Sequence, residues 1–338
     1  MRLSDLDYSL PEELIAQVPA DRRDRSRLMV LDRDTQAIQH HRFSDLPNLL
    51  QPEDLLVLNE SRVFPARLHG NRQHSGALLE VLLLRRRGER TWECLVKPGR
   101  KARIGDRIVF REGQFEAHVM PWPRPEIRLL RFEYQGRFQD WLERLGEVPL
   151  PPYIRREARS EDRERYQTVY ARPVGSVAAP TAGLHFTPEL LSRLEHCAIT
   201  LHVGYGTFQP ISTERIEDHR LHEEVYRIDG EAARRMRRQQ ATGHRIVAVG
   251  TTTVRALEHI VLRHGRIVHE NGSTDLFIRP GFTFQVVGSL LTNFHLPKSS
   301  LLLLVTAFAG RELVEESYRQ AVEHRYRFYS YGDAMLIR

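Results

Sequence analysis

The sequence pattern changes in the first half of the chain, and this change limits the folds that the chain can adopt. Between Arg67 and Glu147, short β-rich segments follow one another at close spacing, separated by Gly, Pro and charged turns. The segments are LLEVLLL, TWECLV, RIVF, QFEAHV and EIRLLRF. This pattern predicts a small β-barrel. Because the sequence on either side has a different pattern, we expect the barrel to be inserted into another domain.

The flanking sequence favours an α/β domain. Residues 54–59 (DLLVLN) form an apolar run that ends in polar residues, as a buried strand does. After the stiff segment 149–154 (PLPPYI), strand and helix patterns alternate. We expect strands at 199–203, 245–249 and 275–278, and helices at 10–17, 188–196, 230–241, 252–263, 299–308 and 312–325. The predicted fold class is α/β, with a larger mixed α/β domain (residues 1–66 plus 149–338) and an inserted small β-barrel domain (67–148).

The composition indicates a globular protein without disulfides or membrane-spanning segments. At 338 residues, 41% hydrophobic and 28% charged, the chain is expected to fold as two globular domains. Cys94 and Cys197 lie far apart and in no CxxC pair, which argues against a disulfide framework or a zinc ribbon and favours the cytoplasm. The acidic N-terminus does not resemble a signal peptide, and the apolar run 301–309 is about half of the ~20 residues needed to cross a bilayer. We therefore expect no membrane association.

Residues 175–186 (GSVAAPTAGLHF) are unusual because small residues surround a single histidine. Small side chains allow a ligand to approach the backbone, which makes Thr181 and Gly183 candidate binding residues and His185 a candidate catalytic residue. A tightly packed loop with a structural histidine explains the same pattern equally well.

The segment 199–208 (ITLHVGYGTF) places His202 on the face opposite Ile199 and Leu201, at the end of an expected strand. His202 is therefore a catalytic candidate, although a structural histidine fits as well. Gly204 and Thr207, which follow it, are candidate binding residues. The glycines do not form a dinucleotide-binding fingerprint, because Gln209 occupies the position of the third glycine.

An expected strand at 245–249 leads directly into Thr251, Thr252 and Thr253 at the start of an expected helix. The free N–H groups of a helix start bind anions, and Arg255 follows within a turn. Thr251, Thr252 and Arg255 are therefore candidates for holding a carboxylate or a phosphate. Ordinary helix capping would explain one of the threonines without any ligand.

A polar stretch, LTNFHLPKSS (291–300), precedes the apolar helix expected at 299–308. A rigid helix behind a polar loop is a usual support for a site, so Asn293 is a binding candidate and His295 a catalytic candidate. The aromatic tail 326–333 could stack bases, but a final core strand fits it as well or better. His219 and His222 have the spacing of two metal ligands, but no third ligand follows from the sequence, so we predict no metal.

Several long segments together resemble one known family, the S-adenosylmethionine:tRNA ribosyltransferase-isomerases of queuosine synthesis. The resemblance covers nearly the whole chain. Its segments are LNESRVFPARLHG (58–70), PLPPYI (149–154), RYQTVYARPVGSVAAPTAGLHFT (165–187), LHVGYGTFQPI (201–211), EDHRLHEE (217–224), VGTTTVRALE (249–258), LLTNFHLPKSSLLLLVTAF (290–308) and YRFYSYGDAMLI (326–337).

The resemblance implies a specific reaction. The ribosyl part of S-adenosylmethionine, a cosubstrate, is transferred to 7-aminomethyl-7-deazaguanine at the anticodon wobble position of tRNA and rearranged, giving epoxyqueuosine and releasing adenine and methionine. No metal is needed, because the sulfonium acidifies the adjacent ribose C–H and a positioned base can remove that proton. It also implies an α/β domain with an inserted β-barrel, in agreement with the pattern above.

In this reaction His185, His202 and His295 are the acid/base candidates, and Tyr166, Tyr170 and Phe328 are candidates for stacking on adenine. We expect a cytoplasmic monomer whose partners are S-adenosylmethionine and tRNA. Two alternatives remain at this point. An S-adenosylmethionine-dependent RNA methyltransferase would need a glycine-rich strand-to-helix turn and an acidic strand end, which we do not find. A non-catalytic RNA-binding protein would leave the small-residue polar loops unexplained.

Overall fold

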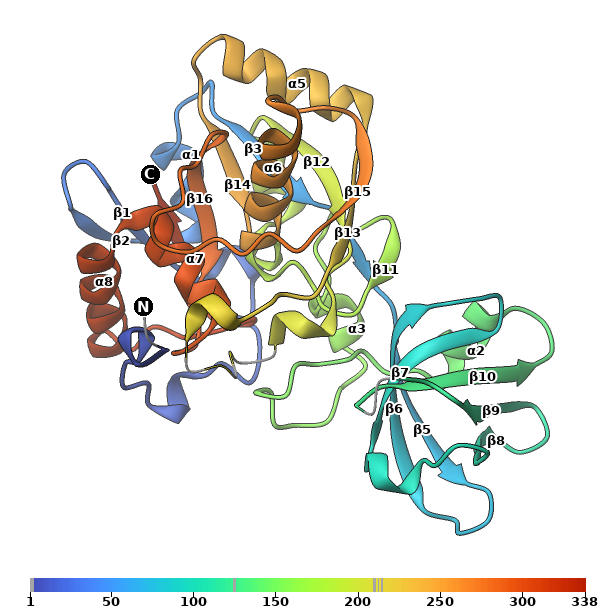
Figure 1. Cartoon of the computed structure of the whole chain (residues 1–338). Helices are drawn as coiled ribbons and strands as arrows, with labels where there is room; N and C mark the ends of the chain where they lie inside the picture. The colour runs from blue at the N-terminus through green and yellow to red at the C-terminus, as the bar shows by residue number, and fades with distance from the viewer. Residues whose placement is uncertain (1–2, 124–125, 209–210, 212, 214) are drawn as a thin grey trace. The chain divides into compact units, whose positions relative to one another are not determined.

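The computed structural model describes residues 3–123, 126–208, 211, 213 and 215–338. It contains two compact units (Figure 1). The first comprises Met1–Arg62, Pro151–Arg156 and Gln167–Arg338, and the second comprises Val63–Leu150 and Glu157–Tyr166. The first unit is mixed α/β and the second contains a closed β-barrel, so the predicted fold class is confirmed.

A mixed sheet forms the centre of the first unit. Its strands are β1 (Arg27–Leu31), β2 (Ile38–Arg42), β3 (Leu55–Asn59), β12 (His196–Leu201), β13 (Glu224–Ile228), β14 (Ile246–Val249), β15 (Glu270–Thr274), β16 (Val287–Asn293) and β17 (Ala334–Ile337). Within the described residues the order is β15-β13-β12-β3-β14-β16-β17-β1-β2. Strands β12, β3, β14 and β16 are parallel, whereas β17 runs antiparallel to β16. The four parallel strands therefore end at one edge of the sheet.

Apolar side chains cover both faces of this sheet. Leu55 and Val57 point into one core, while the alternate residues Leu56 and Leu58 point into the other. This explains why β3 is a continuous apolar run. The helices of the first unit are α1 (Leu46–Leu49), α4 (Pro188–Leu191), α5 (Gly230–Ala241), α6 (Thr251–His264), α7 (Ser300–Ala309) and α8 (Arg311–Glu323). Residues of α5 to α8 belong to the first core, and those of α1 and α4 to the second.

The structure confirms the helices expected at 230–241, 252–263, 299–308 and 312–325, each within two residues at either end. The helix expected at 10–17 is wrong, because only a 3-10 turn, Glu12–Leu14, forms there. The helix expected at 188–196 ends at Leu191, and β12 begins at His196. The strand expected at 275–278 is also wrong, since β15 precedes it and ends at Thr274.

The polar stretch 291–300 begins inside a strand, because β16 continues to Asn293. The aromatic tail is buried, but its strand, β17, begins only at Ala334. Phe328 is completely buried, with its ring centroid 5.2 Å from that of Phe294. The tail thus contributes to the core, and Phe328 packs inside the protein.

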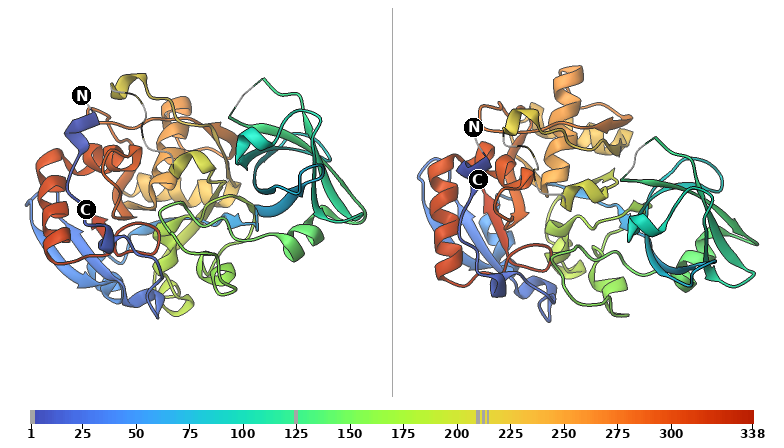
Figure 2. Two further views of the ribbon diagram at one scale, coloured as in Figure 1. Left: turned by 90° about the horizontal axis from the view of Figure 1, so that it is seen from below. Right: turned by 60° about the horizontal axis from the view of Figure 1, so that its bottom comes forward.

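The N-terminal segment of the first unit packs against α8. Figure 2 shows the N-terminal segment beside α8 in both views. The ring of Tyr8 contacts that of Tyr318 on α8, edge to face, with 5.1 Å between centroids. The Tyr8 hydroxyl also donates to the backbone oxygen of His295. The N-terminal segment is thus fixed to the loop that follows β16.

The second unit is built on a barrel whose strands, in the part of the chain that is described, close in the order β10-β7-β6-β5-β8-β9. They are β5 (Arg67–Arg72), β6 (Leu78–Arg86), β7 (Thr91–Lys97), β8 (Arg107–Arg111), β9 (Phe115–Met120) and β10 (Arg128–Tyr134). Phe115 and Phe132 pack in its interior against Phe138 and Trp141 of α2 (Phe138–Leu145). The same unit contains α3 (Asp162–Arg165).

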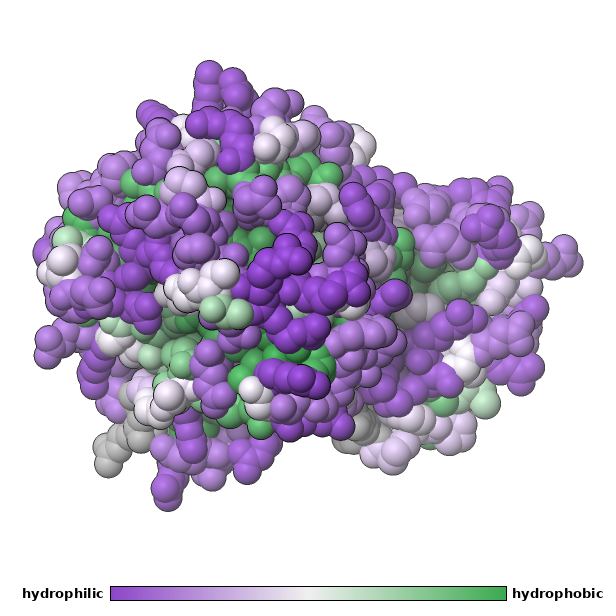
Figure 3. Space-filling model, turned by 90° about the horizontal axis from the view of Figure 1, so that it is seen from above, coloured by the Kyte–Doolittle hydropathy of each residue, from purple (hydrophilic) through white to green (hydrophobic). Residues whose placement is uncertain are grey.

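Hydrophilic residues dominate the face of the molecule drawn in Figure 3, with hydrophobic residues visible in smaller areas between them. Among the described residues, no helix combines the length and the apolarity that a membrane crossing requires.

Candidate active site

The parallel strands place polar residues at their carboxyl edge. β3 ends at Asn59, β16 ends at Asn293, and His202 directly follows β12. β14 leads through Gly250 into α6, which begins at Thr251. In open α/β sheets, ligands bind outside this edge. A ligand site is therefore expected at this edge.

A pocket lies at this edge and joins segments that are far apart in the sequence. It is lined by residues 178–182, by the start of α6, by the end of β16 with the loop after it, and by Tyr329 and Ser330. Five predicted site residues are among those that line it: Thr181, Thr251, Thr252, Asn293 and His295. The structure thus brings residues of three candidate segments, 175–186, 251–255 and 291–300, into one cavity, which we call the edge pocket.

The start of α6 offers hydrogen-bond donors to the edge pocket. The first N–H groups of a helix lack partners within the helix and carry a partial positive charge. Thr251 and Thr252 line the pocket and are each 6% exposed. The hydroxyl of Thr253 instead donates to the backbone oxygen of Val249 at 2.8 Å. Gly250 makes the sharp entry possible, because its φ of 93° is unfavourable for any residue with a side chain.

His185 lies at the end of a 3-10 turn, Thr181–His185, and is 4% exposed. Its Nδ1 is 2.7 Å from the Ser26 hydroxyl, and its Nε2 is 3.1 Å from Nδ2 of Asn293. The ring stacks on Phe43 with 5.0 Å between centroids. Burial lowers the pKa of His185 to about 4, so the ring is neutral at pH 7. Both ring nitrogens are engaged by protein groups.

His295 lines the edge pocket and is 7% exposed. Its Nε2 is 2.9 Å from the hydroxyl of Thr292, and its backbone N–H donates to the Tyr318 hydroxyl at 3.0 Å. Burial lowers the pKa of His295 to about 3. It is the one of the three candidate histidines that contributes to the pocket wall.

His202 does not line the edge pocket, but its neighbour Val203 does. Its Nδ1 is 2.8 Å from the hydroxyl of Ser61, which also bonds the hydroxyl of Ser176 at the end of β11 (Val174–Ser176). A Cβ at Gly175 would lie 2.5 Å from the imidazole ring, so this glycine makes room for the histidine. Burial lowers the pKa of His202, which is half-buried.

Gly183 does not face the edge pocket. A Cβ at this position would lie 2.1 Å from the hydroxyl of Tyr170 and 2.8 Å from Thr168, so the glycine allows close packing of the loop. The ring of Tyr170 contacts Phe186 edge to face. Tyr166 is completely buried and belongs to the second unit. Stacking of either tyrosine on adenine stays a prediction.

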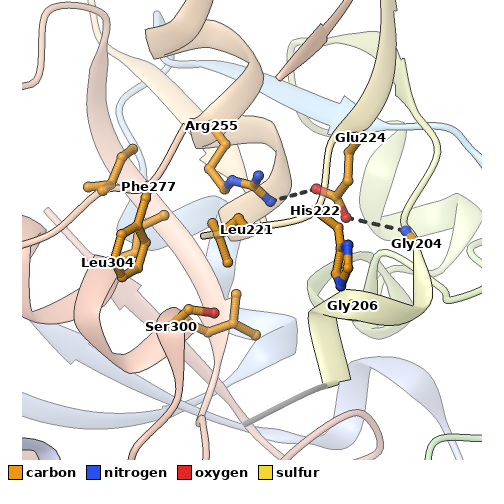
Figure 4. A pocket seen from close by; sticks show the side chains of 11 residues that line it. Gly204, Gly206, Leu221, His222, Glu224, Arg255, Phe277, Ser300 and Leu304 are labelled. Carbon is orange, nitrogen blue, oxygen red and sulfur yellow. Dashed lines mark hydrogen bonds and ion pairs between the residues drawn. The ribbon is translucent and has the colours of Figure 1, made fainter. Parts of the chain in front are cut away.

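A second pocket lies next to the first and shares Leu301 with it. Figure 4 shows the carboxylate of Glu224 between Arg255 and the backbone N–H of Gly204. The Arg255–Glu224 distance is 2.6 Å, and the Gly204–Glu224 distance is 3.3 Å. Arg255 also donates to the backbone oxygen of Leu276 at 2.9 Å. Arg255, predicted to hold a ligand anion, therefore already binds a carboxylate of the protein.

Glu224 is a feature that the sequence analysis missed. It is 4% exposed and joins β13 to α6 and to the Gly204 loop. A signal was present, because in the segment EVYRI (224–228) Glu224 occupies the same face as the apolar residues Tyr226 and Ile228. The predicted binding residue Thr207 lies in a 3-10 turn, Tyr205–Phe208, and its side chain is outside what the structure describes.

No group of three or more His, Cys, Asp or Glu residues that could hold a metal ion occurs within residues 3–123, 126–208, 211, 213 and 215–338.

Known proteins match this chain over its full length. A family model described as "Queuosine biosynthesis protein" matches residues 3–337. The S-adenosylmethionine:tRNA ribosyltransferase-isomerase of Carboxydothermus hydrogenoformans is 52% identical over 343 residues, and that of Symbiobacterium thermophilum is 54% identical over 342 residues; each match covers 100% of both proteins. The crystal structure of S-adenosylmethionine tRNA ribosyltransferase from Thermotoga maritima matches with a TM-score of 0.57 and 41% identity, over 99% of this chain and 100% of that one.

Proposed function

Because the chain belongs to the queuosine biosynthesis family, whose members compared above are S-adenosylmethionine:tRNA ribosyltransferase-isomerases, we propose that its edge pocket is where S-adenosylmethionine reacts. The chain is an enzyme, a transferase and isomerase. It moves the ribosyl part of S-adenosylmethionine onto 7-aminomethyl-7-deazaguanine in tRNA and rearranges it to epoxyqueuosine, with release of adenine and methionine.

One observation carries the assignment of the site: polar residues from several loops meet in one pocket at the carboxyl edge of the parallel strands. The methionine end of S-adenosylmethionine bears a carboxylate, and the start of α6 offers N–H donors and the hydroxyls of Thr251 and Thr252. Because Arg255 is paired with Glu224, we assign the carboxylate to the helix start and not to Arg255.

The first step needs a base that is unprotonated at neutral pH, because the C–H next to the sulfonium must lose its proton. Burial lowers the pKa of His185, His202 and His295, which keeps all three rings neutral. His295 has the better position, since it lines the pocket. His202 is less buried than the other two, and its neighbour Val203 lines the pocket. We propose these two as the proton-transfer residues.

Finer assignments are part of the same proposal, and the family membership supports them. We propose that the tRNA base is at the anticodon wobble position, that no metal takes part, and that the enzyme is a monomer in the cytoplasm. Thr181, beside the same pocket, is proposed to contact the substrate.

The experiment is mass spectrometry of nucleosides and small molecules after mixing the protein with S-adenosylmethionine and tRNA bearing 7-aminomethyl-7-deazaguanine. Epoxyqueuosine with adenine and methionine is the expected result. S-adenosylhomocysteine with a methylated nucleoside would instead identify a methyltransferase. No product, despite tight and salt-sensitive tRNA binding, would identify a binding protein.

The roles of the two histidines are tested by His202→Ala and His295→Ala, assayed separately for substrate binding and for turnover. A proton-transfer residue should lose roughly 10²- to 10⁴-fold in kcat while substrate binding is retained. Full turnover in both variants would show that neither histidine transfers the proton.

A further inference from the structure

We propose that Oδ1 of Asn293 accepts a hydrogen bond from the ammonium group of S-adenosylmethionine, and that His185 is a positioning residue that holds the Asn293 amide in the orientation required. This inference rests on the proposed function of the edge pocket. It concerns the binding of the amino-acid end of the cosubstrate, and it gives His185 a role other than proton transfer.

The hydrogen bonds around Asn293 determine which end of its amide faces which neighbour. Nδ2 of Asn293 lies 3.1 Å from the backbone oxygen of Tyr329. A carbonyl oxygen can only accept, so the amide atom beside it must be the NH₂ group. Tyr329 presents this oxygen from a backbone with φ of 72°, a conformation that non-glycine residues rarely adopt.

The same reasoning fixes the proton on His185. Nδ2 of Asn293 also lies 3.1 Å from Nε2 of His185, so Nε2 must accept and carries no proton. The proton of the neutral ring is then on Nδ1, which donates to the hydroxyl of Ser26 at 2.7 Å. That hydroxyl in turn donates to the backbone oxygen of Arg23 at 3.3 Å. Each donor in this series of hydrogen bonds thus has an acceptor. Both nitrogens of the His185 ring are used, so neither is left for a substrate.

One polar atom of this arrangement has no partner. Asn293 is 2% exposed, it lines the edge pocket, and its Oδ1 is buried without a hydrogen bond in the described part of the chain. Buried acceptors are rarely left unpaired in native proteins, and such exceptions call for an explanation. Because both protons of the amide are used on the protein side, Oδ1 is the atom that Asn293 offers to a ligand, and the ligand must supply an N–H or O–H donor.

The surroundings indicate which donor. The start of α6, with Thr251 and Thr252, borders the same pocket and favours an anion. An α-amino acid carries a carboxylate and an ammonium on one carbon. Its carboxylate could bind at the start of α6 while its ammonium donates to Oδ1 of Asn293. Phe294 and Leu301 in the pocket wall would suit the methylene groups that follow. A nucleotide, with a phosphate beside a sugar hydroxyl, is the other source of a donor next to an anion.

The positioning role predicts a particular set of variants. In His185→Gln, the side-chain oxygen of glutamine can take the place of Nε2 as the acceptor for Asn293, although glutamine cannot transfer a proton. His185→Leu has a similar volume but no acceptor. Calorimetric titration of S-adenosylmethionine without tRNA should show a Kd within about 3-fold of the wild type for His185→Gln and roughly 10-fold weaker for His185→Leu. The kcat of His185→Gln should stay close to that of the wild type.

Asn293→Ala should weaken binding by roughly 10- to 100-fold, as expected for a lost hydrogen bond to a charged group. Since His185 acts through Asn293, adding His185→Leu to Asn293→Ala should cause no further loss. Thermal unfolding of each variant identifies any that fails to fold. Should His185→Leu do so, Asn293→Ala and His185→Gln still decide the question.

The donor is tested with an analogue of S-adenosylmethionine that lacks the α-amino group. The wild type should bind this analogue at least 10-fold more weakly than S-adenosylmethionine, whereas Asn293→Ala should bind both about equally. An equal loss in the two proteins would overturn the ammonium assignment. So would unchanged S-adenosylmethionine binding by Asn293→Ala together with weaker tRNA binding, which points to the nucleotide.

A fall of 10²-fold or more in kcat for His185→Gln, with unchanged Kd, would show that His185 transfers a proton and would overturn the positioning role. Product formation by the wild type is measured independently of these variants. Absence of epoxyqueuosine in that assay contradicts the proposed function, whereas epoxyqueuosine formation with normal binding by every variant contradicts only this inference.

Discussion

Burial determines the protonation state of the histidines at the carboxyl edge of the sheet. His185 and His295 are 4% and 7% exposed, and the pKa values of the two are lowered to about 4 and about 3. Neutral rings suit the two contacts that these residues make. Nε2 of His185 must accept from Asn293, and Nε2 of His295 lies 2.9 Å from the Thr292 hydroxyl. Protonation would place a charge in a buried site, which is unfavourable because the charge loses its hydration.

The lowered pKa values predict how stability depends on pH. Below pH 6.5 these histidines bind protons in the unfolded chain but not in the folded protein. The free energy of unfolding therefore has its full value above pH 6.5. It falls as the pH decreases toward about 4 for His185 and about 3 for His295. In His295→Asn, urea unfolding should show a slope of unfolding free energy against pH, between pH 6.5 and 4, that is smaller by about 1.4 kcal/mol per pH unit. Between pH 7 and 9 both proteins should show the same slope, and an equal slope at acidic pH would contradict the burial of an uncharged His295.

Individual site residues were predictable where a polar residue ends or follows a buried strand. Thr251, Thr252, Asn293 and His295 meet in the edge pocket for this reason. Their partners were not predictable, because the contact of Ser26 with His185 joins positions 159 residues apart in the sequence. Sequence spacing carries no information about such a pair unless the strand order is known.

Helix α6 connects the two pockets, since its first residues line one and Arg255 lines the other. Glycines with positive φ stand at both of its ends, Gly250 with φ of 93° and Gly265 with φ of 70°. The two ends differ in their surroundings, because only Gly250 borders the edge pocket among the described residues. This gives a matched pair of substitutions.

Gly250→Ala and Gly265→Ala should each lower the free energy of unfolding by about 1–3 kcal/mol, because alanine is strained at positive φ. Only Gly250→Ala should also weaken S-adenosylmethionine binding, because it displaces the N–H groups at the start of α6. Urea unfolding and calorimetric titration of both variants check this. Equal affinity in the two variants would mean that the start of α6 does not hold the ligand.

The ion pair between Glu224 on β13 and Arg255 on α6 is nearly inaccessible to solvent, with side-chain exposures of 4% and 6%. Glu224→Gln removes the charge that compensates Arg255 and should lower the free energy of unfolding by about 3–5 kcal/mol. Adding Arg255→Met should recover part of that loss. The exposed pair of Arg319 and Glu316 on α8 is the control, and Glu316→Gln should not change the thermal midpoint measurably. A stable Glu224→Gln protein would contradict the structural role of the buried pair.

Helices that begin after a capping residue, such as α5 and α7, were predicted well. α5 begins after Asp229, whose carboxylate accepts from the N–H of Ala232, and α7 begins after Ser299, whose hydroxyl accepts from Leu302. Residues 10–17 had a similar capping pattern but form only a 3-10 turn, Glu12–Leu14. There Ile15 bridges to Phe328 and the backbone N–H of Ala16 donates to the Phe328 oxygen. Backbone pairing with Phe328 thus takes the place of the helix that the local sequence favours.

The architecture of the whole chain was predictable from the change of sequence pattern, because barrel strands and buried parallel strands have different patterns of apolar residues. The sequence pattern did not indicate that residues 157–166 belong to the second unit, because that assignment depends on tertiary contacts. In the second unit, Arg163 of α3 donates to the backbone oxygens of Glu143 and Gly146 at 3.1 Å and 2.8 Å. These contacts connect α3 with the end of α2.

The boundaries of the inserted domain lead to a test with two fragments. Fragment 63–166 contains both segments of the second unit, whereas fragment 67–148 has the boundaries expected from the sequence. The shorter fragment loses the two Arg163 hydrogen bonds and the ring of Phe64, whose centroid is 5.9 Å from that of Trp92. Both fragments contain all the barrel strands, so both should fold, and fragment 63–166 should unfold cooperatively at a higher urea concentration. Circular dichroism during urea titration measures the two midpoints. Equal midpoints would mean that residues 63–66 and 149–166 add no stability to the barrel and would favour the boundaries at 67 and 148.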